Sequence, residues 1–196
     1  FGSDSGQFGE KIDDIWEEIC SNRNEDGTFG LPSLLPTLNE YLTFGKGELI
    51  LVAGPTGRGK SAYFLAETCN ALRSGVPCVV IDTELTDIVY FPRLIACLSG
   101  VTVKQIKNGK YNNEEESRIK KAMEWLKRQS LVHEYQPIFN KMQIEQVFRK
   151  WFNKGRLGMA VYDYIKPSEK FNAAEISQSL GLMADFLKSV AGNMNI

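Results

Sequence analysis

The sequence predicts an α/β protein in which a parallel sheet carries helices on both faces. One observation is that three apolar runs, at residues 49–53, 78–81 and 158–163, are continuous rather than alternating. Such runs are typical of strands that are buried on both faces. The second observation is that amphipathic patterns of helical length separate these runs. Strands that alternate with helices form a parallel sheet with right-handed crossover connections.

The N-terminal part of the chain predicts one short helix between polar segments. Residues 1–9 are rich in Gly and Ser and read as a flexible lead-in. Over residues 10–20, apolar side chains recur at the spacing of a helix: Ile12, Ile15, Trp16 and Ile19. A helix this short is marginal alone, so its apolar stripe needs a surface. That surface is either its own core or a neighbouring subunit, because the polar residues 21–30 form a tether that permits both.

Helix and strand signals then alternate to the end of the chain. Helices are expected over residues 34–42, 62–73, 86–98, 114–129, 144–154 and 174–190. The helix over 62–73 has a clear end, because Gly75 favours a helix C-terminus and Pro77 cannot continue one. Residues 131–134 are a weaker strand candidate. Residues 101–113, which carry several lysines, are expected to form a solvent-facing segment.

Composition limits the classes of protein that this chain can represent. Its 196 residues, 43% of them hydrophobic, are enough for one sizeable core but leave little room for two independent domains. The net charge is −1, so any contact with nucleic acid must come from a local basic patch. No apolar run approaches the roughly 18 residues of a membrane helix, and no signal peptide is visible. We therefore expect a soluble cytoplasmic protein with no membrane partner.

The four cysteines do not form a recognisable metal or disulfide pattern. They are far apart in the sequence, without C-x-x-C spacing, and three fall in apolar stretches: Cys20, Cys69, Cys78 and Cys97. Free Cys is among the most buried residue types, and thiols persist in a reducing compartment. We interpret these residues as buried thiols rather than disulfides or zinc ligands.

Residues 48–61, ELILVAGPTGRGKS, contain the most informative motif. The motif G-x-x-x-x-G-K-[ST] is matched at every fixed position, between an apolar strand and a helical pattern. The predicted phosphate-binding loop consists of Gly54, Pro55, Thr56, Gly57, Arg58, Gly59, Lys60 and Ser61. The simpler alternative is a glycine-rich turn with a chance lysine, but the flanking strand and helix favour nucleotide binding.

The residue types in this motif explain its chemistry. Glycines allow the loop to curl so that consecutive backbone N–H groups form an anion site at the positive end of a helix. A triphosphate such as ATP is expected there. Lys60 is expected to reach the β- and γ-phosphates, and the Ser61 hydroxyl is expected to ligate Mg²⁺.

Acidic residues follow two of the predicted strands. Ligands of open α/β sheets bind beyond the carboxyl ends of the strands, so Asp82, Glu84 and Asp163 are expected to converge with the loop. Asp163 is a candidate Walker-B acid that holds Mg²⁺ directly or through water. Glu84 is a candidate catalytic base for the attacking water. Each acid could also be an ordinary solvated strand end, or in the case of Asp82 a helix N-cap.

These motifs together resemble one family, the RecA-like motor domain of hexameric replicative helicases of the DnaB type. The resemblance covers roughly residues 28–196 and extends beyond the phosphate-binding loop. It includes GLPS at residues 30–33, GEL at 47–49 and DTEL at 82–85. It also includes GMAVYDY at 158–164 and the E-I-S-x-x-L pattern that begins at Glu175.

The resemblance implies a set of roles and partners. Lys60 and Ser61 correspond to the Walker-A contacts, with Lys60 also catalytic, Glu84 to the catalytic glutamate and Asp163 to the Walker-B acid. The helix at 10–20 corresponds to a linker helix that packs on the adjacent subunit of a hexameric ring. ATP and Mg²⁺ are the implied cofactors. Single-stranded DNA is the implied nucleic acid partner, and a primase or a loader is an implied protein partner.

Three departures from the family pattern shape these expectations. The PTGR segment at residues 55–58 differs from bacterial members and indicates a divergent member, of cellular or viral origin. The loop after Asp163 is short, which reduces or moves a DNA-binding loop. At Ile196 the family continues into a further central strand with a γ-phosphate sensor and an arginine finger. We therefore expect a motor domain over residues 28–196 that is incomplete at its C-terminus, preceded by a lead-in, linker helix and tether over residues 1–27.

Two main functions of different classes are consistent with these residues. The first is an ATP-driven, ring-forming DNA helicase, in which Lys166 and Lys170 are the candidate contacts to the DNA backbone. The alternative is a RecA-like ATP-binding regulatory or helicase-loader module without unwinding activity, which the neutral charge favours. A small-molecule kinase would need a lid with several arginines, and the sequence has no such cluster. Stimulation of ATP hydrolysis by single-stranded DNA, with strand separation, distinguishes the helicase.

Overall fold

The computed structural model describes residues 8–21, 23–24, 29–138, 140–165 and 173–196, with side chains in the last segment described from residue 177 onward. The chain divides into two compact units, Phe1–Gly45 and Lys46–Ile196. The larger unit contains every strand of the described sheet and therefore the edge at which the predicted site residues lie.

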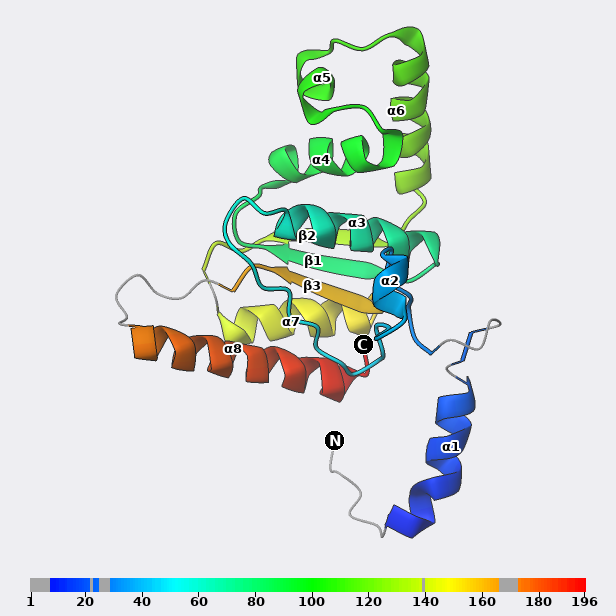
Figure 1. Ribbon diagram of the computed structural model, residues 1–196, viewed down its shortest axis with the longest axis vertical. Coiled ribbons are helices and arrows are strands. Elements are labelled where there is room, and N and C mark those ends of the chain that lie inside the picture. The colour runs from blue at the N-terminus through cyan, green and yellow to red at the C-terminus, as the bar shows by residue number, and fades with distance from the viewer. Residues whose placement is uncertain (1–7, 22, 25–28, 139, 166–172) are drawn as a thin grey trace. The chain divides into compact units, whose positions relative to one another are not determined.

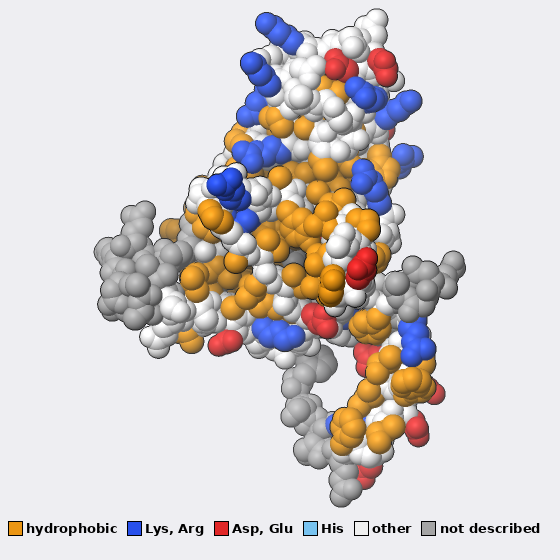
Figure 2. Space-filling view, viewed as in Figure 1, with side chains coloured by type: hydrophobic (Ala, Val, Ile, Leu, Met, Phe, Trp, Pro, Cys, Tyr) orange, Lys and Arg blue, Asp and Glu red, His pale blue; other side chains and the backbone are white. Residues whose placement is uncertain are grey.

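The smaller unit contains the predicted amphipathic helix. A 3-10 turn, η1 (Phe8–Lys11), leads into α1 (Ile12–Ser21), and the short helix α2 (Pro36–Asn39) lies further along the chain. α1 confirms the helix expected over residues 10–20, and none of its residues is buried. Figure 2 shows hydrophobic side chains at its surface, where Trp16 is 58% exposed. The apolar stripe of α1 is therefore not buried within the smaller unit.

The larger unit is built on a three-stranded parallel sheet. Its strands are β1 (Cys78–Asp82), β2 (Leu131–Tyr135) and β3 (Met159–Asp163), in the order β2-β1-β3. The central strand β1 pairs in parallel with both neighbours, and all of its residues are buried. This arrangement confirms the α/β class. β1 and β3 lie at the apolar runs predicted over residues 78–81 and 158–163, and β2 lies at the weaker candidate over residues 131–134.

Helices cover both faces of this sheet (Figure 1). The helices of the larger unit are α3 (Lys60–Arg73), α4 (Asp87–Ser99), α5 (Val103–Asn108), α6 (Asn113–Leu126), α7 (Lys141–Phe152) and α8 (Ala173–Met194). α5 and α6 pack with α4 rather than on the sheet. α3 lies on one face, and α7 and α8 lie on the other. In the described part of the chain, no helix combines the length and the apolar character that crossing a bilayer requires.

The side chains of β1 explain why both faces are covered. Successive residues of a strand point to opposite sides of the sheet. Val79 and Ile81 belong to a buried cluster with Phe148 of α7, whereas Val80 packs with Leu65 of α3. Because each face of β1 is apolar, each needs its own helical layer to remove it from water.

Residues 101–113 differ from the solvent-facing segment that the sequence predicts. They contain α5, and Val101 is buried in a cluster with residues of α4 and α6, among them Ile95 and Ile119. α5 begins with a capping box, in which the Thr102 side chain accepts from the Gln105 backbone and the Gln105 side chain accepts from the Thr102 backbone. The lysines of this segment predicted solvent exposure, whereas the T-x-x-Q capping box and the apolar Val101 determine how the segment packs.

The strand predicted at residues 49–53 is absent from the described sheet. These residues have no strand hydrogen bonding with any described part of the chain, and Leu51 is 62% exposed. A strand exists only when a neighbouring strand supplies its backbone partners. A local apolar pattern cannot supply the neighbouring strand, and none of residues 49–53 is buried, so this prediction is wrong for the structure described.

The cysteines are free, and they fall into two classes. Cys69 and Cys78 are buried as predicted, whereas Cys20 and Cys97 are exposed, so the prediction of burial is wrong for these two. The part of the chain that the structure describes contains no group of three or more His, Cys, Asp or Glu residues that could hold a metal. The Cys97 thiol is hydrogen-bonded to Cys69, and this contact with the charge of Arg73 lowers its pKa to about 6 against the opposing effect of burial.

This contact makes Cys97 the expected site of fastest thiol alkylation. At pH 6 about half of Cys97 would be thiolate, against well under about 1% of an ordinary thiol. After allowing for the lower nucleophilicity of a low-pKa thiolate, we expect Cys97 to react with iodoacetamide about tenfold faster than Cys20. Peptide mass spectrometry over time measures both rates. Cys69→Ala removes the hydrogen-bond donor and should bring the two rates together; equal rates in the unchanged protein would contradict the prediction.

Candidate nucleotide-binding site

The loop before α3 has a backbone that only its glycines adopt without strain. Gly57 and Gly59 have φ angles of +77° and +92°, in the left-handed region that side chains with a Cβ disfavour. Gly59 is the N-cap of α3, so Lys60 and Ser61 open the helix. The amino end of a helix carries partial positive charge and N–H groups without helical partners. The exposed residues 54–59 therefore form a loop suited to an anion.

Lys60 holds its ammonium group over this loop. Its Nζ donates to the Gly54 carbonyl at 2.7 Å and to the Pro55 carbonyl at 3.0 Å. Both contacts are charge-assisted hydrogen bonds, which are stronger than neutral ones. The positive charge consequently lies beside the loop N–H groups, where phosphate oxygens could replace the two carbonyls as acceptors.

Two acids stand at the adjacent ends of β1 and β3. Asp82 and Asp163 are partners in the register of the sheet, and the Thr83 backbone donates to the Asp163 carbonyl at 2.8 Å. Asp82 is 1% exposed and Asp163 is 6% exposed. Glu84 follows in the turn after β1 and is exposed. The carboxyl edge of the sheet thus carries two buried acids and one that solvent reaches.

The surroundings of Asp163 show which groups the fold brings together. The hydroxyl of Ser61 is hydrogen-bonded to the Asp163 carboxylate, and the charges of Asp82, Glu84 and Lys60 all act on it. Burial, aided by the two neighbouring acids, raises the pKa of Asp163 above its ordinary value, although Ser61 and Lys60 oppose this. The residues predicted as site residues from the loop and from two strand ends therefore share one edge of the sheet.

Comparison with known proteins identifies the family. A family model described as DnaB-like helicase C terminal domain matches residues 30–196. The chain belongs to this family. The match includes the loop at the start of α3 and both strand-end acids, and it begins two residues after the boundary at residue 28 that the sequence predicts.

Curated relatives of this DnaB-like domain are distant. Replicative DNA helicase DnaB of Geobacillus stearothermophilus is 24% identical over 196 residues, covering 92% of this chain and 43% of the relative. Replicative DNA helicase DnaB of Treponema pallidum is 28% identical over 102 residues, covering 51% of this chain and 23% of the relative. A probable replicative DNA helicase of Trieres chinensis is 22% identical, with 78% and 34% covered. The chain spans less than half the length of each.

Two solved structures share the fold. One is an ATPase domain, which superposes with a TM-score of 0.81 at 19% identity, covering 98% of this chain and 69% of that one. The other is a DnaB-like replicative helicase, studied with its interactions with primase, which gives 0.74 at 19% identity, with 99% and 47% covered. Both likenesses show that the chain has the RecA-like helicase ATPase fold.

The DnaB-like site also has a place that suits a magnesium ion. The Oδ1 atom of Asp163 is buried and accepts no hydrogen bond from the described residues, and the Ser61 hydroxyl lies beside the same carboxylate. The described residues contain no group of three or more His, Cys, Asp or Glu side chains that could hold a metal, so the donors that suit an ion here are the Ser61 hydroxyl and the Asp163 carboxylate. Mg²⁺ is commonly held by one or two protein oxygens, with phosphates and water completing the shell. The residues present therefore fit Mg²⁺ bound together with a nucleotide.

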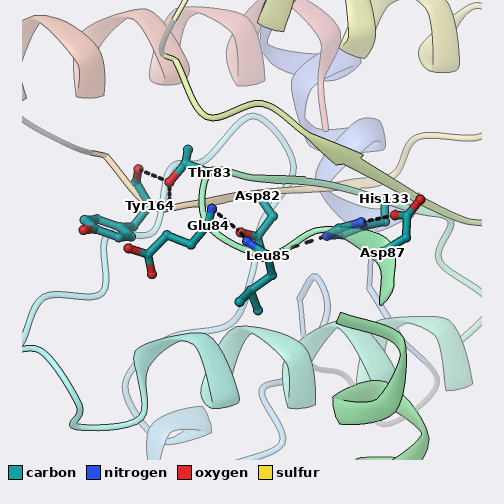
Figure 3. A network of polar contacts seen from close by, with 7 residues as sticks. All are labelled: Asp82, Thr83, Glu84, Leu85, Asp87, His133 and Tyr164. Atoms are coloured by element: carbon teal, nitrogen blue, oxygen red, sulfur yellow. Dashed lines mark hydrogen bonds and ion pairs between the residues drawn. The ribbon is translucent and has the colours of Figure 1, made fainter. Parts of the chain in front are cut away.

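Asp82 has a role that the sequence did not reveal. Its Oδ1 atom accepts hydrogen bonds from the backbone N–H groups of Glu84 at 2.7 Å and Leu85 at 2.6 Å (Figure 3). The predicted alternative, that Asp82 is a helix N-cap, is wrong in detail, because the N-cap of α4 is Thr86. Asp82 instead closes the turn that carries Glu84. Its spacing of two residues before Glu84 is the signal that could have indicated this turn.

The two predicted DNA contacts, Lys166 and Lys170, lie outside the described residues, so their candidate role stays a prediction. Pro55, Thr56 and Arg58 lie in the exposed loop beside the glycines, as the motif requires. His133 lies in β2 and contacts two acids near the site.

Proposed function

We propose that this chain is the motor domain of an ATP-dependent replicative DNA helicase. The motor is residues 28–196, and residues 1–27 are its lead-in, linker helix and tether. It hydrolyses ATP at the subunit interfaces of a ring and thereby moves along single-stranded DNA and unwinds duplex. The observation that carries this proposal is the gathering of Lys60, Glu84 and Asp163 at one sheet edge of a DnaB-like domain.

ATP is held by the loop of residues 54–61. Backbone N–H groups at the start of α3 receive the phosphate oxygens, and Lys60 exchanges its contacts with the Gly54 and Pro55 carbonyls for the β- and γ-phosphates. Ser61 and Asp163 would hold a Mg²⁺ ion that accompanies the nucleotide. When bound, this ion neutralises charge on the phosphates.

Glu84 acts as the base that prepares water for attack on the γ-phosphate. It is exposed at the turn after β1, where water reaches it, and its backbone is held by Asp82. A carboxylate in this place orients the water and accepts its proton. The buried Asp163 is less suited to this task, because it is engaged with Ser61.

Assembly into a hexameric ring uses α1. Its exposed apolar stripe, with Ile12, Trp16 and Ile19 all at least 37% exposed, supports docking on a neighbouring subunit through the tether of residues 21–30. Removing such a stripe from water is favourable at about 25 cal/mol for each Å² of apolar surface buried. A primase or a loader is the further protein partner that we propose, at work in the cytoplasm or, for a viral protein, inside the host cell.

The complete protein that contains this chain provides the test. We expect single-stranded DNA to stimulate its ATP hydrolysis by about tenfold and ATP to drive separation of a forked duplex. Steady-state hydrolysis with and without DNA and a strand-separation assay measure these outcomes. The proposed contacts of Lys166 and Lys170 go to the DNA backbone, so rising salt should reduce the stimulation for all sequences alike.

A regulatory or loader module predicts a different result. Such a protein binds ATP, but DNA does not stimulate hydrolysis and no strands separate. Replacing both Lys166 and Lys170 with alanine should reduce DNA stimulation while leaving hydrolysis without DNA unchanged. The same double change at Lys104 and Lys107 of α5, both exposed, serves as the matched control and should leave DNA stimulation intact.

A further inference from the structure

His133 of β2 lies between two carboxylates that come from different elements. Its Nδ1 atom is 2.6 Å from Asp87 Oδ1 at the start of α4, and its Nε2 atom is 3.9 Å from Asp82 Oδ2 at the end of β1 (Figure 3). The ring also stacks on Tyr90, with centroids 4.1 Å apart and planes 18° apart. The His133 side chain is only 9% exposed. The imidazole is therefore held by contacts on its face and on its edge.

Asp82 links this histidine to the turn that carries Glu84. One carboxylate oxygen of Asp82 accepts from the Glu84 and Leu85 backbones, and the other faces His133. The Asp82 side chain is 2% exposed, so solvent does little to orient it. The two oxygens belong to one planar group, and a rotation that follows a change at His133 also changes the hydrogen bonds to Glu84.

The protonation state of His133 determines whether a lone pair or an N–H group faces the Asp82 carboxylate. A neutral imidazole has a single N–H, and the short contact with Asp87 takes it at Nδ1. Nε2 then presents a lone pair toward the Asp82 carboxylate, and this buried atom has no hydrogen-bond partner among the described residues. An imidazolium carries N–H groups on both sides and so matches both acids.

We infer that His133, in its protonated form, is a positioning residue that holds Asp82 and, through it, the Glu84 turn in the geometry for hydrolysis. This inference rests on the proposed role of Glu84. His133 itself does not contact the reacting groups. Its contribution is to oppose rotation of the Asp82 carboxylate away from the Glu84 and Leu85 N–H groups.

The surroundings of His133 give the direction of the pH dependence. The titratable groups that face the ring are Asp82 from β1 and Asp87 and Tyr90 from α4. Burial disfavours the imidazolium, but the hydrogen bond with Asp87 and the negative charges of both acids outweigh it and raise the pKa of His133 above its ordinary value. Burial raises the pKa of Tyr90, which stays neutral. The positioning is thus complete below the ordinary histidine pKa and is lost as pH rises through the raised one.

Asp87→Asn in the complete protein tests this inference. Asp87 is 84% exposed, so the fold should tolerate the change, and the amide still accepts a hydrogen bond while its negative charge is gone. In the unchanged protein, we expect kcat for ATP hydrolysis to fall by about tenfold as pH rises through the pKa of His133, which gives the pH profile an alkaline limb. Asp87→Asn should move that limb to lower pH. KM for ATP should change little, since the phosphate-binding loop is untouched. Glu114→Gln removes an exposed acid from the first turn of α6 and should leave the limb in place.

A second variant and a second readout make the outcome decisive. His133→Gln is neutral at every pH and should abolish the alkaline limb. Amide hydrogen exchange in residues 83–85, corrected for the intrinsic effect of pH, should rise along the same limb without ATP and shift likewise in Asp87→Asn. An alkaline limb that stays in place in both variants would overturn the inference. Amide hydrogen exchange in residues 83–85 that is the same in both variants as in the unchanged protein would also overturn it. Exchange that follows His133 in a protein without ATP hydrolysis would instead refute the proposed function alone.

Discussion

Replacing Glu84 with glutamine is expected to lower kcat for ATP hydrolysis by about 10²- to 10⁴-fold. The amide has the size of the carboxylate but cannot accept a proton from the attacking water. ATP affinity should stay within about twofold, because binding energy comes from the loop and not from the base. The change also removes one of the neighbouring negative charges that raise the pKa of Asp163. Single-turnover hydrolysis and titration with a fluorescent ATP analogue measure the two quantities.

Glu84→Asp provides the informative comparison. It keeps the charge but withdraws the carboxylate by one methylene, so it should retain part of the activity that Glu84→Gln loses. Hydrolysis at the normal rate in Glu84→Gln would show that the base assignment is wrong. An equal loss of ATP affinity in both variants would instead indicate damage to the nucleotide site.

Replacing Lys60 with alanine is expected to remove both binding and catalysis. The ammonium makes two charge-assisted contacts at the mouth of the loop, at 2.7 Å and 3.0 Å, and no other lysine lies in the motif. Loss of a charged hydrogen-bond donor should weaken ATP binding by about 10- to 100-fold, and hydrolysis should fall to background. The same titration and hydrolysis assays apply.

Lys104→Ala is the matched control for Lys60→Ala, because it removes an exposed lysine from α5. It should bind and hydrolyse ATP as the unchanged protein does. Thermal unfolding should be nearly equal for the two variants, since both lysines lie away from the buried clusters. Normal ATP affinity in Lys60→Ala would show that Lys60 does not contact the phosphates of ATP.

The sequence predicted most of the fold correctly, and its errors have one physical origin. β1 and the helices other than α5 can be recognised from apolar patterns that depend only on residues close in the chain. The run at 49–53 has the same pattern, yet it lies outside the described sheet, because pairing needs a second strand that the pattern does not contain. The burial of Val101 was not predicted for a related reason, because residues of α4 and α6 form the surface that buries it.

The candidate site divides in the same way. The loop residues could be recognised because a fixed spacing of glycines, lysine and serine serves one local geometry, which the left-handed Gly57 and Gly59 display. Asp163 and Glu84 could be named because parallel strands end at a common edge. Neither argument reaches His133, whose partner Asp87 is 46 residues away in the sequence.

Neighbours along the chain are therefore enough to specify the phosphate-binding loop, the amphipathic α1 and the strands that carry the acids. Tertiary structure alone decided that Ser61 meets Asp163, that residues 49–53 have no strand partner in the described residues, and that His133 faces Asp82. Local conformation follows from interactions over a few residues, which a sequence displays directly. Contacts between distant residues, and the protonation they impose, depend on how whole elements pack.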